Sequence, residues 1–320
     1  MLWEMTPVGT IASEYRALTE GCGLLDRSER GKLAISGAQA AEFLQGQVTN
    51  DVEALPPGAG CYAAFLTPKG KMLGDLRILN AGGELLLDTE RGALQELFNM
   101  IRRFCIGYSV ELHKRTLERG LLSLIGPRAA AAAGVEDLLG AEHAHAVVQI
   151  DGISARAIRT DVGVDLLCDA PDLPALAAAM TEREAVPVSQ DAAETVRIER
   201  GRPCYGIDLD DTVIPQEAGL NERAVSFTKG CYVGQETVAR LYYRGKPNRQ
   251  LRGLRCGGAV APGDEISFDG RPVGRVASTT LSPRLGPLAL ALVRREAPPG
   301  TGVGVGVGSV RAEVVELPFS

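Results

Sequence analysis

Apolar residues in the first part of the chain recur at spacings that alternate between those of helices and those of strands. A helix is predicted near residues 10–20, and a strand at 32–36, where apolar and polar residues alternate. The segment AQAAEFLQGQVTNDV has one apolar face at helical spacing, which predicts a helix ending near Asn50. The runs GCYAAFL and KMLGDLRIL predict two strands, joined through TPKGK as a hairpin.

Further helices and strands follow in no regular order. Thr89 is placed to cap a helix over residues 94–101, and strands are predicted at 108–114 and 121–126. An alanine-rich helix after Pro127 precedes alternating runs, and the segments PDLPALAAAMTE and QDAAETVRIERG read as helices. A doubly wound parallel sheet would show a uniform alternation of strand and helix. The pattern therefore predicts an α+β fold made of mixed subdomains.

The character of the chain changes after residue 245. Glycine and proline become frequent, the alternating runs are short, and no helical spacing remains, which predicts a small β-barrel or sandwich. The run GVGVGVG lacks the GxGxxG spacing of a dinucleotide loop and is interpreted as a glycine-lined β-segment. We expect a core of two intertwined α+β subdomains over residues 1–240 and a β-barrel domain over 241–320.

Composition limits the classes of function. The 320 residues are 45% hydrophobic and 23% charged, with a net charge of -6, as expected of a soluble globular protein and not of a general nucleic-acid binder. No apolar run is long enough for a membrane span, and MLWEMTPVGT does not resemble a signal peptide, so a cytoplasmic location is expected. The seven scattered cysteines form no CxxC pair, and the three histidines fit no metal or triad spacing.

One cysteine has a distinctive setting in KGCYVGQE. Gly230 and Gly234 bracket Cys231, and a helix is predicted from Gln235 onward. A helix N-terminus and the nearby Lys229 would both favour the thiolate, so Cys231 is a candidate reactive residue. The alternative interpretation is a small buried hydrophobe under a turn. Lys229 has its own alternative as an ordinary solvated lysine.

A carboxylate also interrupts an apolar strand. Asp75 lies within Met72-Leu73-Gly74-Asp75-Leu76, so its side chain faces either solvent or a polar pocket. Composition by itself favours solvent.

Several motifs together resemble a known family. KGCYVGQE followed by ARLYYRG and preceded by IPQEAGL resembles the YgfZ folate-binding proteins, which are linked to iron-sulfur cluster assembly and repair. The chain from about Gly23 to Leu317 resembles, more distantly, the glycine-cleavage T-protein, a tetrahydrofolate-dependent aminomethyltransferase. The matching segments LLDRSERGKLAISGAQAAEFLQGQVTNDV, GCYAAFLTPKGKMLGDLRI, VRIERGRPCYGIDL and TLSPRLGPLALALV occur in the family's order. The resemblance implies a T-protein-like fold with a folate pocket in the core.

The resemblance also implies roles for individual residues. Asp75 matches an aspartate beside the reacting folate nitrogen, where it would orient or move a proton. Tyr62 matches a tyrosine lining that site, and Asp165 matches an acid that accepts two N-H donors from the pterin edge. With Lys229 and Tyr232 these three form the predicted folate-binding set, and Cys231 and Asp75 are the candidate catalytic residues. No metal site is predicted.

Three T-protein features are absent from this sequence. The loop before Asp165 is shortened, Ala193 stands where an arginine is expected, and the sequence ends at ELPFS without an arginine-bearing tail. The segment from Arg240 to Arg255 is rich in arginine and includes two tyrosines. It is interpreted either as a patch attracting the glutamate tail of folate or an acidic partner, or as a solvated linker.

The leading hypothesis is a tetrahydrofolate-binding protein that supports iron-sulfur enzymes or their assembly proteins through Cys231. The first alternative is a folate-dependent aminomethyl or one-carbon transferase. The second is a thiol redox protein, for which no resolving cysteine can be assigned.

Overall fold

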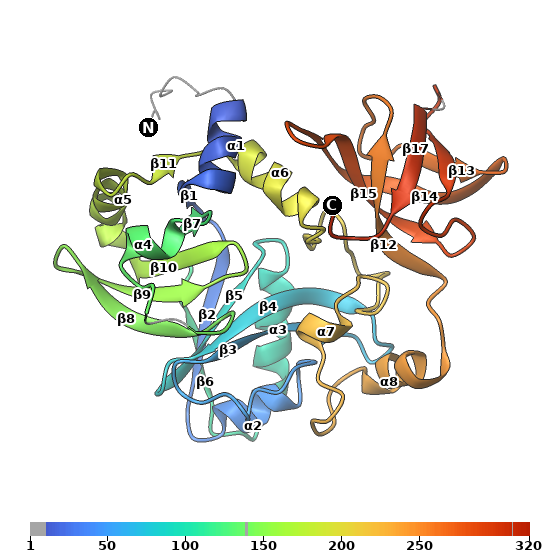
Figure 1. The fold of residues 1–320 in the computed structure, drawn as a ribbon. Helices are drawn as coiled ribbons and strands as arrows, with labels where there is room; N and C mark the ends of the chain where they lie inside the picture. The colour runs from blue at the N-terminus through green and yellow to red at the C-terminus, as the bar shows by residue number, and fades with distance from the viewer. Residues whose placement is uncertain (1–10, 138–139, 309) are drawn as a thin grey trace. The chain divides into compact units, whose positions relative to one another are not determined.

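The computed structural model describes residues 11–137, 140–308 and 310–320, and its contacts divide them into two compact units (Figure 1). The first unit contains the described residues up to Ser28 together with Leu117–Arg197. The second contains Glu29–Thr116 and Ile198–Ser320. Each unit is therefore assembled from two separate stretches of the sequence.

A six-stranded sheet forms the first unit. Its strands in spatial order are β11 (Val186–Pro187), β1 (Gly23–Asp26), β7 (Arg119–Ile125), β10 (Gly163–Asp169), β9 (Ile153–Arg159) and β8 (His145–Ile150). The helical segments are α1 (Ile11–Glu20), α4 (Ala129–Ala133), η1 (Ala170–Asp172), α5 (Leu173–Glu182) and the greater part of α6 (Gln190–Glu199). Alternate residues of β7 and β10, among them Leu122, Leu124 and Leu166, pack with α4 and α5 into one apolar core.

The second unit begins with an antiparallel sheet of five strands. In spatial order these are β3 (Gly60–Leu66), β4 (Met72–Asn80), β5 (Glu84–Thr89), β2 (Gly31–Ser36) and β6 (Glu111–Lys114). Phe65, Leu76 and Leu87 point to one face and are buried against α2 (Ala40–Gln45) and α3 (Leu94–Phe104). Because side chains alternate along a strand, the residues between them point to the opposite face.

A closed six-stranded barrel ends the second unit, shown in orange and red in Figure 1. Its strands are β12 (Arg249–Cys256), β15 (Gly286–Arg294), β14 (Arg271–Ser282), β13 (Glu265–Phe268), β16 (Gly302–Val305) and β17 (Val310–Val315). Between sheet and barrel the chain forms α7 (Asn221–Ala224) and α8 (Gln235–Arg244). The predicted α+β fold with a C-terminal β-barrel is confirmed, and GVGVGVG begins with β16 as expected.

Two local predictions are wrong. The helix expected to reach Asn50 stops at Gln45, with Gly46 after it, and Val48 instead forms an isolated bridge with Phe65. Thr89 does not cap a helix, because it is the last residue of β5 and Ala93 precedes α3. Its hydroxyl donates to the carbonyl oxygen of Asp75 at 2.5 Å, so a tertiary contact takes the place of the cap.

Among the residues that the structure describes, no helix combines the length and the apolar character needed to span a bilayer.

Candidate functional site

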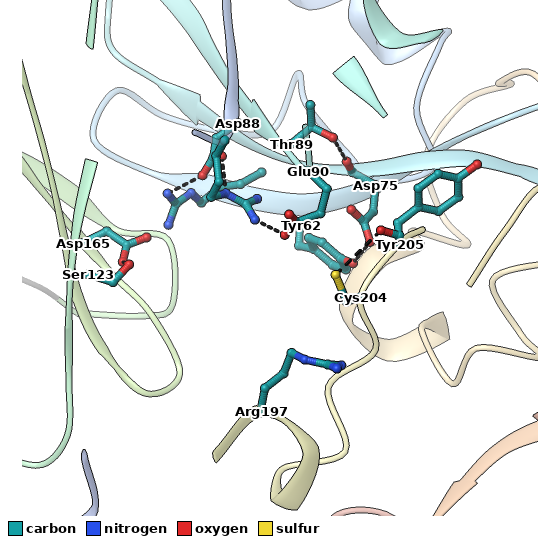
Figure 2. Close-up of polar contacts among 12 residues, drawn as sticks. Tyr62, Asp75, Asp88, Thr89, Glu90, Ser123, Asp165, Arg197, Cys204 and Tyr205 are labelled. Atoms are coloured by element: carbon teal, nitrogen blue, oxygen red, sulfur yellow. Dashed lines mark hydrogen bonds and ion pairs between the residues drawn. The ribbon is translucent and has the colours of Figure 1, made fainter. Parts of the chain in front are cut away.

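The register of the β3–β4 hairpin brings Tyr62 and Asp75 together. Tyr62 lies opposite Arg77, and Ala64 lies opposite Asp75, so Tyr62 and Asp75 are diagonal neighbours on one face of the sheet. This is the face away from the apolar core of α2 and α3. The Tyr62 hydroxyl donates to Oδ2 of Asp75 at 2.6 Å, as Figure 2 shows.

Asp75 is a buried acid with a perturbed pKa. Asp75 is only 5% exposed. The expectation from composition, a carboxylate that faces solvent, is therefore wrong. Burial raises the pKa of Asp75 to about 6, although the Tyr62 hydrogen bond and the Arg30 guanidinium favour the charged form. Burial and the neighbouring Asp75 carboxyl raise the pKa of Tyr62 well above its usual value, so the hydroxyl keeps its proton. The pair therefore presents a carboxyl group that changes charge within the physiological range.

A row of paired charges supports this face of the sheet. Asp88 on β5 lies opposite Arg77 and accepts from its Nη2 at 2.5 Å. Arg30 donates through Nε to the other Asp88 oxygen at 2.6 Å, and through Nη1 to Glu90 (Figure 2). Because Asp88 bonds two guanidinium groups and Arg30 bonds two carboxylates, these side chains have fixed positions. These ion pairs form a frame of charged side chains. The positive charge of Arg30 acts on Asp75 from within this frame, while its hydrogen bonds go to Asp88 and Glu90.

Gly74 lets the strand that carries Asp75 lie close to the core. A Cβ atom at this position would lie 2.6 Å from the Phe65 ring and 2.7 Å from the Ala93 side chain. Any larger residue would displace β4 from β3 or from the segment before α3. The glycine therefore fixes the depth at which the neighbouring carboxyl group is held.

Asp165 lies in the first unit, on β10. It is opposite Ser123 of β7, whose hydroxyl donates to Oδ1 of Asp165 at 2.7 Å (Figure 2). Both residues are buried. The matched serine and aspartate make a polar position in an otherwise apolar pair of strands.

Lys229 is buried and contacts backbone. Its Nζ donates to the carbonyl oxygens of Gln45, Val48 and Asn50 at 2.5, 2.7 and 2.9 Å. It also lies 5.1 Å from the centre of the Tyr232 ring. Burial lowers the pKa of Lys229 to about 8. The ammonium group thus holds the turn after α2, and its alternative as a solvated lysine is wrong.

Cys231 is exposed, which excludes the interpretation of a buried hydrophobe. The predicted helix after it is α8, which starts at Gln235. Gly234 takes a left-handed φ of 84°, and a Cβ there would lie 2.6 Å from the carbonyl oxygen of Thr67 in the β3–β4 turn. The segment that carries Cys231 is therefore packed, at Gly234, against the hairpin that carries Tyr62 and Asp75.

Tyr232 is buried beside Lys229 and packs with residues of the loop segments, among them Leu209, Val213 and Val225. Burial raises the pKa of Tyr232 to about 12. Among the predicted folate-binding residues, the structure brings Tyr62 and Asp75 into direct contact, and Lys229 with Tyr232 into a second pair.

The arginine-rich segment is divided by its contacts. Arg249 donates to Glu217 at 3.1 Å, Arg252 to Glu316 at 2.5 Å, and Arg255 to the carbonyl oxygen of Ser320. Arg240, Arg244 and Lys246 are exposed. The second half of the segment therefore belongs to the barrel, and the first half forms a basic surface on and beyond α8.

Sequence reasoning missed the residues that connect these parts. Thr49 accepts from the Ala64 backbone N-H at 2.9 Å and donates to the carbonyl oxygen of Ala224. The next residue, Asn50, donates through Nδ2 to the carbonyl oxygen of Tyr62 at 2.8 Å. The only sequence signal for this role was VTND within the family motif, because hydrogen bonds to distant backbone depend on the tertiary fold.

No three histidine, cysteine or acidic side chains within the described ranges are grouped so that they could hold a metal ion.

Known proteins resemble this chain over nearly its whole length. Residues 5–229 match the GCVT N-terminal domain, and residues 249–320 match the glycine cleavage T-protein C-terminal barrel domain. An aminomethyltransferase of Rubrobacter xylanophilus is 31% identical, with 99% of this chain and 88% of that protein aligned. A chloroplastic protein of Arabidopsis thaliana is 29% identical over 82% of this chain, which spans 63% of the plant protein.

The fold agrees with these matches. The crystal structure of glycine cleavage system aminomethyltransferase T from Bartonella henselae superposes with a TM-score of 0.87 at 25% identity, covering 98% of this chain and 90% of that one. Both halves of the sequence and the whole fold thus match the same group of proteins. The chain belongs to the glycine cleavage T-protein family, with its GCVT N-terminal domain and C-terminal barrel domain.

Proposed function

We propose that this protein binds tetrahydrofolate at the Tyr62–Asp75 pair of its second unit. The observation that carries the proposal is the buried Asp75 carboxyl group, which accepts a hydrogen bond from the Tyr62 hydroxyl and has a pKa raised to about 6 by burial. The chemistry of the donor set suits a pterin-type ligand, because carboxylates accept the N-H groups that such a ring presents. Asp165, in the first unit, is a second buried acceptor of this kind.

Tetrahydrofolate supplies a nitrogen that accepts or releases a one-carbon unit. Asp75 would hydrogen-bond a nitrogen of the ligand and hold or take up a proton there, which a pKa near neutrality favours. Tyr62 would keep the carboxyl group oriented. Burial of Asp75 would exclude bulk water from the contact.

We further propose that the bound folate serves the support of iron-sulfur enzymes or of their assembly proteins, with Cys231 as the reactive group. Two features support this role: the resemblance of KGCYVGQE to the YgfZ proteins, and the exposure of Cys231 on the segment packed against the β3–β4 turn. An exposed thiol can reach a protein partner or a cluster carried by that partner.

Aminomethyl transfer is the second candidate. It is favoured by the near full-length match to proteins named aminomethyltransferase and by the presence of Asp75 with Tyr62. The departures in sequence at the shortened loop and at Ala193 count against it. Under this alternative the same pocket would bind folate, and the thiol would be dispensable.

Two assays distinguish the candidates. In cells that lack this protein, wild type should restore the activity of iron-sulfur enzymes, and Cys231→Ser and Asp75→Asn should not. In a glycine-cleavage assay with a lipoylated carrier protein, the purified chain should release no methylenetetrahydrofolate. Full restoration by Cys231→Ser together with methylenetetrahydrofolate production would overturn the iron-sulfur role in favour of the transferase.

A further inference from the structure

Helix α7 is fastened to strand β3 beside the candidate site. Thr49 donates to the carbonyl oxygen of Ala224 in α7 and accepts from the backbone N-H of Ala64 in β3. Asn50 Nδ2 lies 2.8 Å from the carbonyl oxygen of Tyr62 and 3.2 Å from that of Arg223. One dipeptide therefore bonds to two consecutive residues of α7 and to two positions of β3, so the spacing between them is fixed.

This spacing places a cation over the ring that contacts Asp75. The guanidinium carbon of Arg223 lies 5.3 Å from the centre of the Tyr62 ring, within the range of a cation–π contact. The positive charge of Arg223 also opposes the rise in the pKa of Tyr62 that burial causes. One face of the ring is thus occupied by protein, and a ligand has only the opposite face or the edge to contact.

We propose that Arg223 is a positioning residue for the Tyr62–Asp75 pair, holding the Tyr62 ring so that its hydroxyl stays directed at the Asp75 carboxyl group. The consequence for ligand affinity rests on the proposed folate function, whereas the effect on Asp75 does not. Arg223 acts through Tyr62, because the contact over the ring is its link to the pair.

Other groups act on the pair from the neighbouring elements. Around Asp75 and Tyr62, the titratable and charged groups that influence them are Arg30 before β2, Asp88 and Glu90 at the end of β5, Tyr205 after α6 and Arg223 in α7. Arg30 is already bonded to Asp88 and Glu90. Arg223 contacts the pair through the Tyr62 ring, so the titration of Asp75 reports the effect of its substitution.

The test is a carbon-13 NMR titration of the Asp75 carboxyl group in the full-length chain, assigned by comparison with Asp75→Asn. In Arg223→Met the midpoint should move upward, because a less ordered Tyr62 donates less well to the ionised carboxylate. Arg223→Lys keeps a cation over the ring and should restore most of the wild-type midpoint. A residue that only stabilised α7 would lower the melting temperature without moving the midpoint.

A double-mutant cycle checks the route of the effect. Tyr62→Phe removes the hydroxyl and should raise the Asp75 midpoint by itself. Arg223→Met should then add nothing in the Tyr62→Phe background. An equal upward shift in both backgrounds would mean that Arg223 acts on Asp75 directly by charge and would overturn the proposal, as would an unchanged midpoint in Arg223→Met. Should Arg223→Met fail to fold, Arg223→Gln takes its place in the same cycle.

Tetrahydrofolate titration provides the link to function. We expect Arg223→Met to bind about fivefold more weakly than wild type, because a Tyr62 side chain that is less ordered in the free protein must be ordered when the ligand binds. Wild type that shows no saturable binding would remove the folate function while the Asp75 titration still decides the role of Arg223. If Arg223→Met has normal folate affinity but a shifted midpoint, the role of Arg223 is limited to the titration of Asp75 and does not extend to ligand binding.

Discussion

At the scale of single residues, the site depends on how a carboxyl group is buried. Asp75 accepts a hydrogen bond from the neutral Tyr62 hydroxyl, whereas Asp88 on the next strand bonds two guanidinium groups. The difference explains why burial dominates at Asp75 and raises its pKa to about 6. A strand built for stability alone would carry an apolar residue at this position.

Replacement of Asp75 should therefore stabilise the protein in a pH-dependent way. The pKa of Asp75 is about 6 in the folded chain and ordinary in the unfolded chain, so the native state binds more protons between about pH 4 and 6. Wild-type stability from this group falls as pH rises through that window. Asp75→Asn should gain about 2 kcal/mol in free energy of unfolding, relative to wild type, between pH 4 and pH 7. Urea unfolding at both pH values measures it, and a difference independent of pH would contradict the account.

The sequence predicted part of the Tyr62–Asp75 site and not the rest. Tyr62 and Asp75 were proposed from family motifs, and the hairpin register explains their contact. Arg223 and Arg30 were not identified, because an arginine carries no local signal of the ring or acid it will meet. The exposure of Cys231 followed from tertiary packing and could not be decided from KGCYVGQE alone.

At the scale of elements, the helix predicted to end near Asn50 stops at Gln45, and hydrogen bonds from Lys229 hold the segment that follows. Apolar residues recur at helical spacing from Ala40 to Val48, but Gly46 follows α2. The Lys229 ammonium group binds the carbonyl oxygen of Gln45, the last residue of α2, and two carbonyl oxygens beyond its end. Those carbonyl groups would otherwise have been satisfied by continuing the helix. Periodicity predicts which face is apolar, and it does not report a distant side chain that ends the element.

Loss of the Lys229 contacts should be costly. Lys229→Met leaves three carbonyl oxygens without their donor, and we expect the free energy of unfolding to fall by about 2–4 kcal/mol. Chemical denaturation of wild type and variant measures this. Lys246→Met is the matched control, because Lys246 is exposed and its replacement should change stability by less than about 0.5 kcal/mol. Equal effects of the two substitutions would show that the Lys229 contacts contribute little.

The two glycines around Cys231 should differ in their tolerance of a methyl group. Gly234 has a left-handed φ of 84° and no room for a Cβ beside Thr67, whereas at Gly230 a Cβ would meet no atom within 4 Å. Gly234→Ala should lower the free energy of unfolding by about 1–3 kcal/mol, and Gly230→Ala should be nearly neutral. Thermal unfolding of both variants gives the comparison, and a neutral Gly234→Ala would refute the packing of this turn on the β3–β4 hairpin.

At the scale of the whole molecule, the sequence pattern predicted the class of fold more readily than its connectivity. Short alternating runs with frequent glycine and proline predicted a small β-barrel or sandwich, and the structure shows a closed barrel. Neither periodicity nor composition predicts that residues 11–28 join Leu117–Arg197 in one unit, because the pairing of β1 with β7 joins segments about a hundred residues apart.

The central claim is that the ionised Asp75 carboxylate contacts bound tetrahydrofolate. The most direct test is the tetrahydrofolate affinity of wild type and Asp75→Asn between pH 5 and 8, measured anaerobically by calorimetry, with Glu111→Gln on the exposed edge of the same sheet as control. Wild type and the control should lose affinity as pH falls through about 6, approaching tenfold per unit below it, because the carboxylate becomes protonated. Asp75→Asn should bind weakly with a flat profile. An Asp75→Asn profile that matches wild type in affinity and pH dependence would contradict the account.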